Sequence, residues 1–564
     1  MSSSASSNAL GTYQSRPWVR QYAPNVPPTL SCAVVSPLQA FDRCLEENPD
    51  AIALWYFNTP QTYLELDRQA RRVQAHWSPL VSKGERVAIM NQNTPATLIA
   101  LIAAWRLGAI VIPLSPMLTH WELLHYLEDG EPHAAMVGFA QAAAFLEAAS
   151  KWGHPVDVIV ARRHEHLLAT DRPDLLKSLA IDPSEPEFQC RGFDELPTTG
   201  ASMASESPNQ FDIAFLTYTS GTTGKPKAAR NTHANVCFSA EVYRVWLQLN
   251  REDVLLAAAP FSHITGLVAH IAAAWLTQIP LVMAYRFDPA TMLSLIEQHG
   301  CTSTVAAITA YIALLDHPRF DPSKLRSFTK LFSGGAPVSA SVVDRWETTT
   351  GVYIHNAYGL TETTSPTHLV PFGLRAPIDP ESGVLSIGVP VPDTDCRIVE
   401  LAEPDSAVAT SIVGELLVRG PQLAMGYWRN AEETAQAFQN GWLRTGDLGR
   451  TDASGWFYIV DRAKDVIVAS GFKVWPREVE LALESHPWVK EAAVVGVPDS
   501  YRGETPKAFV ILHEGAHAAD EVLIAHCRER LAPYKVPRSI EVVKALPRNH
   551  AGKLLRRQLK VVAP

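Results

Sequence analysis

Residues 86–113 hold a short apolar segment, a helix-forming segment and a second apolar segment in direct succession. Residues 86–90 and 109–113 are short and contain several β-branched residues, whereas residues 96–107 have the length of a helix and are almost wholly apolar. Two strands joined by one helix have to run in the same direction, because the helix carries the chain back to the edge where the first strand began. The succession predicts a parallel sheet covered by helices, which restricts the chain to an α/β fold.

The same alternation returns later in the chain. We expect strands at residues 211–218 and 303–307 and helices at residues 288–300 and 339–349. From about residue 387 to residue 459 the pattern changes to short strands separated by Gly, Pro and Asp turns, which predicts a small β-rich subdomain. A chain of 564 residues is long enough for several such units.

A compact α+β pattern begins after Asp461. The elements expected there alternate between helix and strand: helices at residues 478–485 and 520–531, and strands at residues 489–497 and 508–512.

We predict the main domain boundary at residues 461–465, where four of five residues are charged and lie between two apolar strands. The boundary divides the chain into an N-terminal domain (residues 1–461) and a C-terminal domain (residues 462–564). An ordinary polar turn has the same composition, and composition alone favours that alternative.

Charge and cysteine usage argue against several kinds of partner. The formal net charge is −9, which argues against nucleic acid, because such binding rests on a basic surface. The seven cysteines are scattered, odd in number and never spaced as C-x-x-C, which favours a reducing compartment over a disulfide framework or a zinc site. No basic segment followed by an apolar one opens the sequence, so we expect a cytoplasmic protein.

Two apolar stretches, residues 96–113 and 257–285, are long enough to be tested as membrane spans. A span needs about 20 largely unbroken apolar residues. The first stretch contains Arg106 and Gly108 and fits a helix followed by a buried strand, whereas the second is interrupted by polar residues, glycine and proline. We therefore expect a soluble protein that is at most peripheral to a membrane.

The most informative string is Tyr-Thr-Ser-Gly-Thr-Thr-Gly-Lys-Pro-Lys at residues 218–227, at the end of an apolar strand. Its glycines allow the backbone to approach an anion, and its amides, hydroxyl groups and two lysines can donate to phosphate. It is no Walker A loop, because that spacing is absent and Pro226 disfavours a helix at this point. A polar surface loop is the alternative, but the ordered string with Lys225 and Lys227 favours a phosphate-binding loop.

Three further strings supply groups suited to a nucleotide. Residues 356–364 offer the hydroxyl of Thr361 to a phosphate and the carboxylate of Glu362, a hard oxygen ligand, to Mg²⁺. The alternative is that Thr361 and Glu362 are a helix N-cap and the acid of its first turn, which requires no further function. Asp447 can accept from two ribose hydroxyls, and a plain turn aspartate is its alternative. Lys553 offers an ammonium group to the nucleotide, and the alternative is that it is an ordinary surface charge exposed to solvent.

Together and in this order, these strings resemble those of the adenylate-forming superfamily, which includes acyl-CoA synthetases, luciferases and the adenylation domains of peptide synthetases. The resemblance extends from Trp18 to Arg557, nearly the whole chain. Residues 18–23, 426–428 and 471–476 are most similar to bacterial medium- and long-chain fatty acyl-CoA ligases. The resemblance implies a large N-terminal domain of stacked α/β subdomains plus a β-rich subdomain, joined to a small mobile α+β C-terminal domain.

The resemblance also implies a ligase reaction in two halves. A carboxylic acid, expected to be a fatty or related apolar acid, and ATP with Mg²⁺ form acyl-AMP and pyrophosphate, and the thiol of coenzyme A then displaces AMP. The alternatives are an acyl-AMP ligase that delivers to a carrier protein, an aryl-CoA ligase, and a catalytically inactive binding protein on the same scaffold. The joint presence of five residues argues against the last: Lys553, Glu362, Thr361, Asp447 and Arg462.

The resemblance assigns the sites residue by residue. Catalytic roles fall to Lys553, Thr361, Glu362 and His263, and Glu362 is also the metal ligand. The residues implied in ATP binding surround its phosphates, adenine and ribose: Thr219, Ser220, Gly221, Thr222, Thr223, Gly224, Lys225, Lys227, Gly335, Ala336, Pro337, Asn356, Ala357, Tyr358, Asp447 and Arg462. The hinge pivot and the residues facing coenzyme A follow in the C-terminal part: Lys464, then Ser470, Gly471 and Lys473.

The acid substrate is expected to lie against Ser333, Gly334, Thr364 and His263. Amino-acid-activating relatives carry an aspartate in the region of His263 that holds the ammonium group, so the histidine favours an acid without an α-amine. A satisfied core histidine is the alternative for His263 by itself. The family often has glycine where this chain has Ala228, a departure that lies beyond the phosphate donors.

Overall fold

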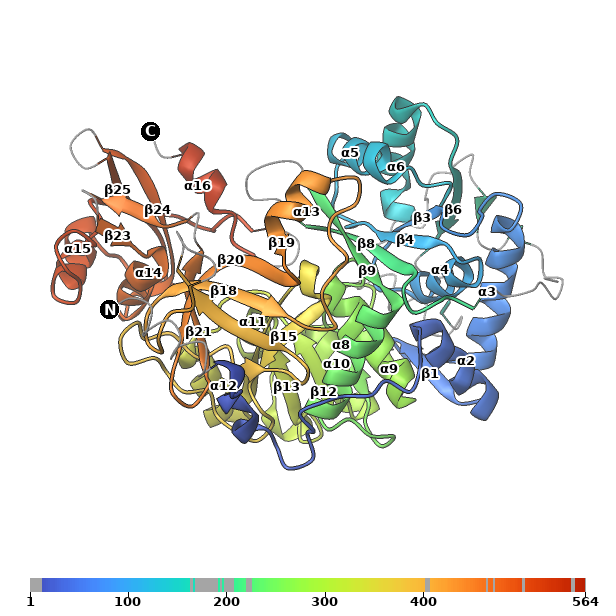
Figure 1. Ribbon diagram of the computed structural model, residues 1–564, viewed down its shortest axis with the longest axis horizontal. Coiled ribbons are helices and arrows are strands. Elements are labelled where there is room, and N and C mark those ends of the chain that lie inside the picture. Colours follow the sequence, from blue (N-terminus) through green and yellow to red (C-terminus); the bar gives the residue numbers. More distant parts are fainter. Residues whose placement is uncertain are drawn as a thin grey trace.

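The computed structural model (Figure 1) describes residues 13–162, 166–167, 191–192, 195–196, 207–219, 226–400, 406–462, 465–469, 472–499, 503–548 and 553–562 of the chain. In this part of the chain the strands form four sheets, with nine, seven, five and five strands.

The predicted strand–helix–strand succession forms the centre of the seven-stranded sheet. β3 (Arg86–Met90) and β4 (Ile110–Pro113) are parallel neighbours, and α4 (Pro95–Arg106) connects them. Every residue of α4 is buried, which accounts for its almost uniformly apolar sequence. The strand order includes one antiparallel pair, β8 with β9: β7 (Arg191–Gly192), β6 (Asp157–Ala161), β5 (Ala134–Gly138), β3, β4, β8 (Ile213–Thr219) and β9 (Lys227–Thr232).

Arg106 ends α4 inside the protein. Its guanidinium Nη2 lies 2.7 Å from Asp67 Oδ1 of α3 (Tyr63–Trp77) and 3.1 Å from Asp42 Oδ1 of α2 (Pro37–Glu47). A buried cation is tolerated when it is paired in this way, and the pairing ties three helices together.

Helices cover both faces of the seven-stranded sheet. Along β3, Val87 and Ile89 belong to the large core that also contains α4 and the nine-stranded sheet. Ala88 and Met90 point the other way, into a second core with α5 (His120–Gly130) and α6 (Phe139–Trp152). This alternation is that of a strand buried on both sides, and it confirms the expected stacked α/β arrangement.

Six neighbouring strands of the nine-stranded sheet, from β14 to β1, run parallel, so their carboxyl ends lie along one edge. The order across the sheet is β16 (Val389–Pro390), β15 (Ser365–Leu369), β14 (Ile354–Leu360), β13 (Lys330–Ser333), β12 (Ser303–Ala306), β10 (Leu255–Leu256), β11 (Leu281–Met283), β1 (Ile52–Tyr56) and β2 (Thr59–Thr62).

The helices of this region agree with the expected pattern. The two predicted helices correspond to α10 (Pro289–His299), which Asp288 caps by accepting from the Thr291 N–H, and to α12 (Ala340–Thr350). The others are η1 (Pro17–Gln21), α8 (His233–Trp246), η3 (Gly266–Ala272), α9 (Ala273–Thr277), α11 (Ile308–Leu315), η4 (Pro322–Lys324) and η5 (Thr361–Thr363).

The second apolar stretch, residues 257–285, is divided between η3, a turn of π-helix, the short α9 and the strand β11. No helix in the described parts of the chain is long and apolar enough to cross a membrane.

The predicted β-rich subdomain is a five-stranded antiparallel sheet. Its strands, with the helix α13 (Ala431–Ala437) among them, are β17 (Asp395–Val399), β18 (Gly414–Arg419), β19 (Phe438–Gln439), β20 (Trp442–Thr451) and β21 (Phe457–Arg462). The expected boundary at residues 461–465 begins with the last two residues of β21, and its role as a domain boundary stays a prediction.

The C-terminal unit, drawn in orange-red and red in Figure 1, is an α+β structure with a core on each face of its sheet. Ala492 and Val494 of β24 (Val489–Asp499) face α14 (Pro476–Glu484) and α15 (Asp520–Arg528), whereas Ala493 and Val495 face α16 (Arg556–Val562). α14 begins two residues before the expected start because Pro476 occupies its first turn. Its elements are β22 (Ile467–Ala469), β23 (Phe472–Val474), α14 (Pro476–Glu484), β24 (Val489–Asp499), β25 (Gly503–Leu512), α15 (Asp520–Arg528), β26 (Ser539–Val542) and α16 (Arg556–Val562).

Candidate active site

The carboxyl ends of the parallel strands bring several predicted site segments to one edge of the nine-stranded sheet. The turn with His263 comes after β10, residues 334–337 follow β13, and Tyr358 lies near the end of β14. Ser333 and Asn356 are direct partners in the pairing of β13 with β14. Crevices outside the carboxyl ends of such strands are common ligand-binding places in open α/β sheets.

Asp447 brings two other predicted ATP-binding residues together. It lies opposite Arg462 in the pairing of β20 with β21, and Arg462 Nε is 3.0 Å from Asp447 Oδ1. The Tyr358 hydroxyl, from β14, donates to Asp447 Oδ2 at 2.5 Å. Asp447 is only 2% exposed, and donors from two different sheets hold its two oxygens.

These contacts decide the charges in the cluster. Burial raises the pKa of the Tyr358 hydroxyl well above its usual range, and the Asp447 carboxylate raises it further. The same carboxylate is the main cause of the raised pKa of Arg462. A neutral phenol and a guanidinium therefore orient one carboxylate, whose remaining lone pairs can accept from hydroxyl groups.

A single tyrosine connects the predicted metal ligand with the phosphate-binding string. The Tyr427 hydroxyl donates to Glu362 Oε1 at 2.8 Å. The ammonium of Lys227 lies 5.4 Å from the centre of the Tyr427 ring and 2.5 Å from Glu433 Oε2. Glu362, at the hydroxyl, and Lys227, near the ring, are thus both neighbours of one aromatic side chain.

Asn231 joins the strand after the phosphate-binding string to the turn that carries Glu362. Its amide Nδ2 donates to the Thr361 carbonyl oxygen at 3.0 Å and to Thr364 Oγ1 at 2.9 Å. Thr364 is fully buried, so the structure places this predicted substrate residue in a contact that holds the turn. The turn with Thr361 is fixed to β9, the strand that begins with Lys227.

Glycines permit a close approach between neighbouring chain segments at this edge. A Cβ atom added at Gly359 would lie 1.7 Å from the Ser365 carbonyl oxygen, and one added at Gly334 would lie 2.8 Å from the Ala357 carbonyl oxygen. Gly335 adopts a φ of 81°, in the left-handed region that favours glycine. The predicted adenine-binding segment therefore depends on glycine for its backbone path.

The remaining pocket residues differ in how their polar atoms are used. Asn356 Nδ2 donates to the Ser386 carbonyl oxygen at 2.9 Å, and His263 Nδ1 accepts from the Thr265 N–H at 3.3 Å. The hydroxyl of Ser333 is fully buried and has no hydrogen-bond partner among the described residues. The Ser333 hydroxyl, at the carboxyl end of β13, therefore remains available for a further hydrogen bond.

Two residues of this site were not singled out from the sequence as site residues. Tyr427 appeared there only within a string typical of the family. Asn231 lies an even number of residues after Lys227 on β9, so both side chains share one face of the strand. The even spacing from Lys227 was the feature of the sequence that could have pointed to Asn231. No feature of the sequence near Tyr427 or Glu362 indicates the contact between them.

Several predicted residues lie outside the parts of the chain that the structure describes: Ser220, Gly221, Thr222, Thr223, Gly224, Lys225, Lys464, Ser470 and Gly471. Lys473 is in β23, but its side chain also lies outside the description. Thr219 and Lys227, which flank the phosphate-binding string, face each other in the antiparallel pairing of β8 with β9.

Glu362 suits a metal that arrives with a substrate. No three His, Cys, Asp or Glu side chains of the described residues are grouped in a way that could hold a metal ion. Mg²⁺ is commonly held by one or two carboxylates together with substrate phosphates. Since Tyr427 binds Glu362 Oε1, the other carboxylate oxygen fits that role.

Comparison with known proteins identifies the family. The family model for AMP-binding enzymes matches residues 41–428, and that for the AMP-binding enzyme C-terminal domain matches residues 478–553. The long-chain-fatty-acid–CoA ligase of Bacillus subtilis (strain 168) is 34% identical over 563 residues, covering 96% of this chain and 97% of that protein.

Solved structures agree with this similarity. The anthranilate CoA ligase AuaEII in complex with anthranoyl-AMP matches with a TM-score of 0.82 and 26% identity, covering 95% of this chain and 98% of that chain. ATP-bound MatB from Rhodopseudomonas palustris matches with a TM-score of 0.80 and 26% identity, over 93% and 98% of the two chains. The chain therefore belongs to the AMP-binding enzyme family and is an AMP-forming acid–CoA ligase, with ATP and coenzyme A as its substrates.

Proposed function

We propose that this ligase activates a fatty or related apolar acid as acyl-AMP and then transfers the acyl group to coenzyme A. The observation that carries the proposal is the position of two clusters at the end of β14. Tyr358 of β14 holds Asp447, and Glu362, four residues further along the chain, is held by Tyr427 beside Lys227. A nucleotide whose ribose hydroxyls bind Asp447 can therefore extend its phosphates toward Glu362 and Lys227.

The first half-reaction joins two anions. A carboxylate oxygen of the acid attacks the α-phosphorus of ATP. The bond between the α-phosphorus and the oxygen that bridges to the β-phosphorus breaks, and pyrophosphate leaves with the electron pair. Lys227 and Lys553 supply positive charge where negative charge develops, and a preorganised contact of this kind is worth about 10²–10³ in rate. Glu362 would hold Mg²⁺ together with the triphosphate, and the ion would supply further positive charge there.

The second half-reaction needs the same acyl carbon to be reached by a thiol. We assign Ser470, Gly471 and Lys473 to coenzyme A and Lys464 to the pivot of a domain rotation between the steps. The cores on both faces of the C-terminal sheet support the domain rotation, because they allow the C-terminal unit to move as one body. Its separate family match over residues 478–553 supports the same division.

The acid is assigned from chemistry and similarity. None of the residues expected around it, His263, Ser333, Gly334 and Thr364, is acidic, so an ammonium group finds no counter-charge among them. The neighbouring η3 is wholly buried and mostly apolar, which suits an apolar acyl chain. The similarity to the Bacillus subtilis ligase favours a fatty acid, whereas the similarity to the anthranilate CoA ligase favours an aromatic acid as the second candidate.

Pyrophosphate release across a panel of acids tests the proposal. The panel contains medium- and long-chain saturated acids, benzoate, anthranilate and amino acids, each measured with and without coenzyme A. We expect the highest kcat/KM with a saturated acid, and loss of free thiol in step with pyrophosphate. Preference for an aromatic acid would establish the second candidate, and acyl-AMP formation without thiol loss would indicate delivery to a carrier protein.

A further inference from the structure

The segment that carries Lys553 is closed by a backbone pairing. Arg548 and Leu554 form an isolated antiparallel bridge, and the Leu555 N–H donates to the Pro547 carbonyl oxygen at 2.8 Å. Lys553 directly adjoins this pairing, so its position depends on the contacts that hold the two paired segments.

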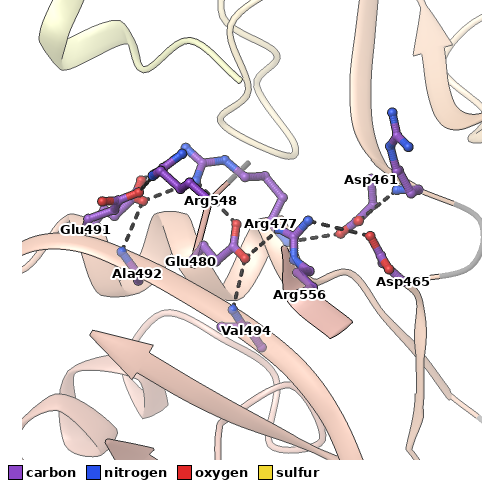
Figure 2. Close-up of polar contacts among 11 residues, drawn as sticks. Asp461, Asp465, Arg477, Glu480, Glu491, Ala492, Val494, Arg548 and Arg556 are labelled. Atoms are coloured by element: carbon purple, nitrogen blue, oxygen red, sulfur yellow. Dashed lines mark hydrogen bonds and ion pairs between the residues drawn. The ribbon is translucent and has the colours of Figure 1, made fainter. Parts of the chain in front are cut away.

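Each of the two paired segments has an arginine that is bound to the body of the C-terminal unit. Arg548 is itself one of the paired residues, and Arg556 follows Leu554 by two residues. Arg548 forms an ion pair with Glu491 of β24. Arg556, the first residue of α16, has its Nη2 2.6 Å from Glu480 Oε1 of α14. Figure 2 shows these arginines within one row of charged side chains that begins at Glu491 and ends at Asp461 and Asp465.

Glu480 is the buried anchor of this row. Its side chain is 3% exposed, and its Oε1 accepts from the Val494 N–H at 3.0 Å. A second guanidinium, that of Arg477, lies 3.4 Å from the other carboxylate oxygen. Burial alone would raise the pKa of Glu480, but Arg556 and Arg477 hold it below its usual range. The anchor is therefore an ionised carboxylate that depends on its arginines.

The row continues to the strand of the predicted ribose site. Arg556 Nη1 lies 3.6 Å from Asp465 Oδ2. Next to Asp465, the buried Asp461 accepts from the Arg477 N–H at 3.0 Å and from the Arg462 N–H at 2.7 Å. Arg462 is the last residue of β21 and pairs with the carboxylate assigned to the ribose. One guanidinium thus connects the Lys553 segment with the chain that leads out of the nucleotide site.

We propose that Arg556 is a positioning residue for the first half-reaction, which sets the place of Lys553 through its ion pairs with Glu480 and Asp465. The inference rests on the role proposed above for Lys553. Arg556 is three residues from Lys553 and contacts two carboxylates on different segments, a task that suits the planar fork of arginine better than the single ammonium of lysine. If the ion pairs served only the stability of the C-terminal unit, their loss would affect both half-reactions alike.

The test compares Arg556→Gln and Glu480→Gln with Arg530→Gln. The control removes an exposed arginine of the same unit, which pairs with Glu529 at 3.0 Å. Adenylation is followed by exchange of labelled pyrophosphate into ATP, and transfer by thioester formation from ready-made acyl-AMP and coenzyme A. Thermal unfolding identifies variants that do not fold, and Arg556→Lys replaces Arg556→Gln if that variant fails to fold.

We expect Arg556→Gln and Glu480→Gln to lower the kcat of adenylation about 10- to 100-fold, because small misplacements of a catalytic group have effects of this size. The KM for ATP and the rate of transfer should stay within about twofold of the wild type, as should all rates of Arg530→Gln. In a Lys553→Ala background, Arg556→Gln should have no further effect, since it acts through the lysine.

The outcomes separate the inference from the role on which it rests. Equal losses in both half-reactions, or an unchanged effect of Arg556→Gln in the Lys553→Ala background, would overturn the positioning role while leaving that of Lys553 intact. If Lys553→Ala itself slows adenylation and transfer equally, the proposed role of Lys553 is wrong, and the inference is overturned with it.

Discussion

Replacing Asp447 by alanine should raise the KM for ATP and leave the KM for the acid nearly unchanged. Asp447 is buried, and its carboxylate is held between Tyr358 and Arg462 in an orientation suited to ribose hydroxyls. A hydrogen bond to a charged group contributes about 1.5–3 kcal/mol. Since about 1.4 kcal/mol corresponds to a factor of ten, the KM for ATP should rise roughly 10- to 150-fold.

The same substitution should lower the free energy of unfolding. It leaves the Arg462 guanidinium and the Tyr358 hydroxyl without their shared acceptor. Breaking a fully buried ion pair costs about 3–5 kcal/mol, but the Arg462 side chain is 26% exposed and water can replace part of the lost contact. We therefore expect a loss of about 1–3 kcal/mol, measured by chemical unfolding at neutral pH.

Pyrophosphate release with ATP and the acid varied separately gives the two KM values. Asp395→Asn is the matched control, because Asp395 lies in the same sheet and pairs with Arg16 and Arg419 at 2.7 Å each, at the surface. This control should leave both KM values unchanged. A folded Asp447→Ala variant with an unchanged KM for ATP, or with an equal rise in both values, would refute the ribose assignment.

Lys553→Ala should slow acyl-AMP formation by about 10²-fold or more and leave thioester formation from ready-made acyl-AMP near the wild-type rate; equal losses would contradict the domain alternation. Gly471→Trp should do the reverse, sparing pyrophosphate release and blocking transfer to coenzyme A. Excess chelator should abolish turnover with ATP, and full activity under those conditions would exclude a metal at Glu362. Burial raises the pKa of the Asp461 carboxyl from 3.8 to about 7. The free energy of unfolding of the wild type should therefore fall relative to that of Asp461→Asn as the pH rises from about 4 to about 7, and the difference should be constant above that range. Parallel curves of unfolding free energy against pH for the two proteins would contradict the shift.

The sequence by itself determined many of the secondary elements, and it predicted the chemistry of the main strings. The helix expected at residues 96–107 is α4 (Pro95–Arg106), and the strands around it lie where the apolar segments placed them. Such elements are predictable because apolar periodicity and boundary residues such as Pro95 act within a few positions of the chain. The phosphate-binding role of residues 218–227 is predicted from residue types alone, since glycines, hydroxyls and lysines suit an anion in any fold, and it stays a prediction.

Only the tertiary structure decided which of these groups meet. Tyr358 and Asp447 are 89 residues apart, and the contact between them depends on the order and register of strands in two different sheets. The same holds for Arg106, whose charge in an apolar helix is explained only by Asp67 and Asp42 on two neighbouring helices. A one-residue change in strand register would turn each side chain to the opposite face, and no local pattern specifies the partner strand. The physical reason is that the free energy of such contacts comes from burial shared between distant segments, which no short window of the sequence contains.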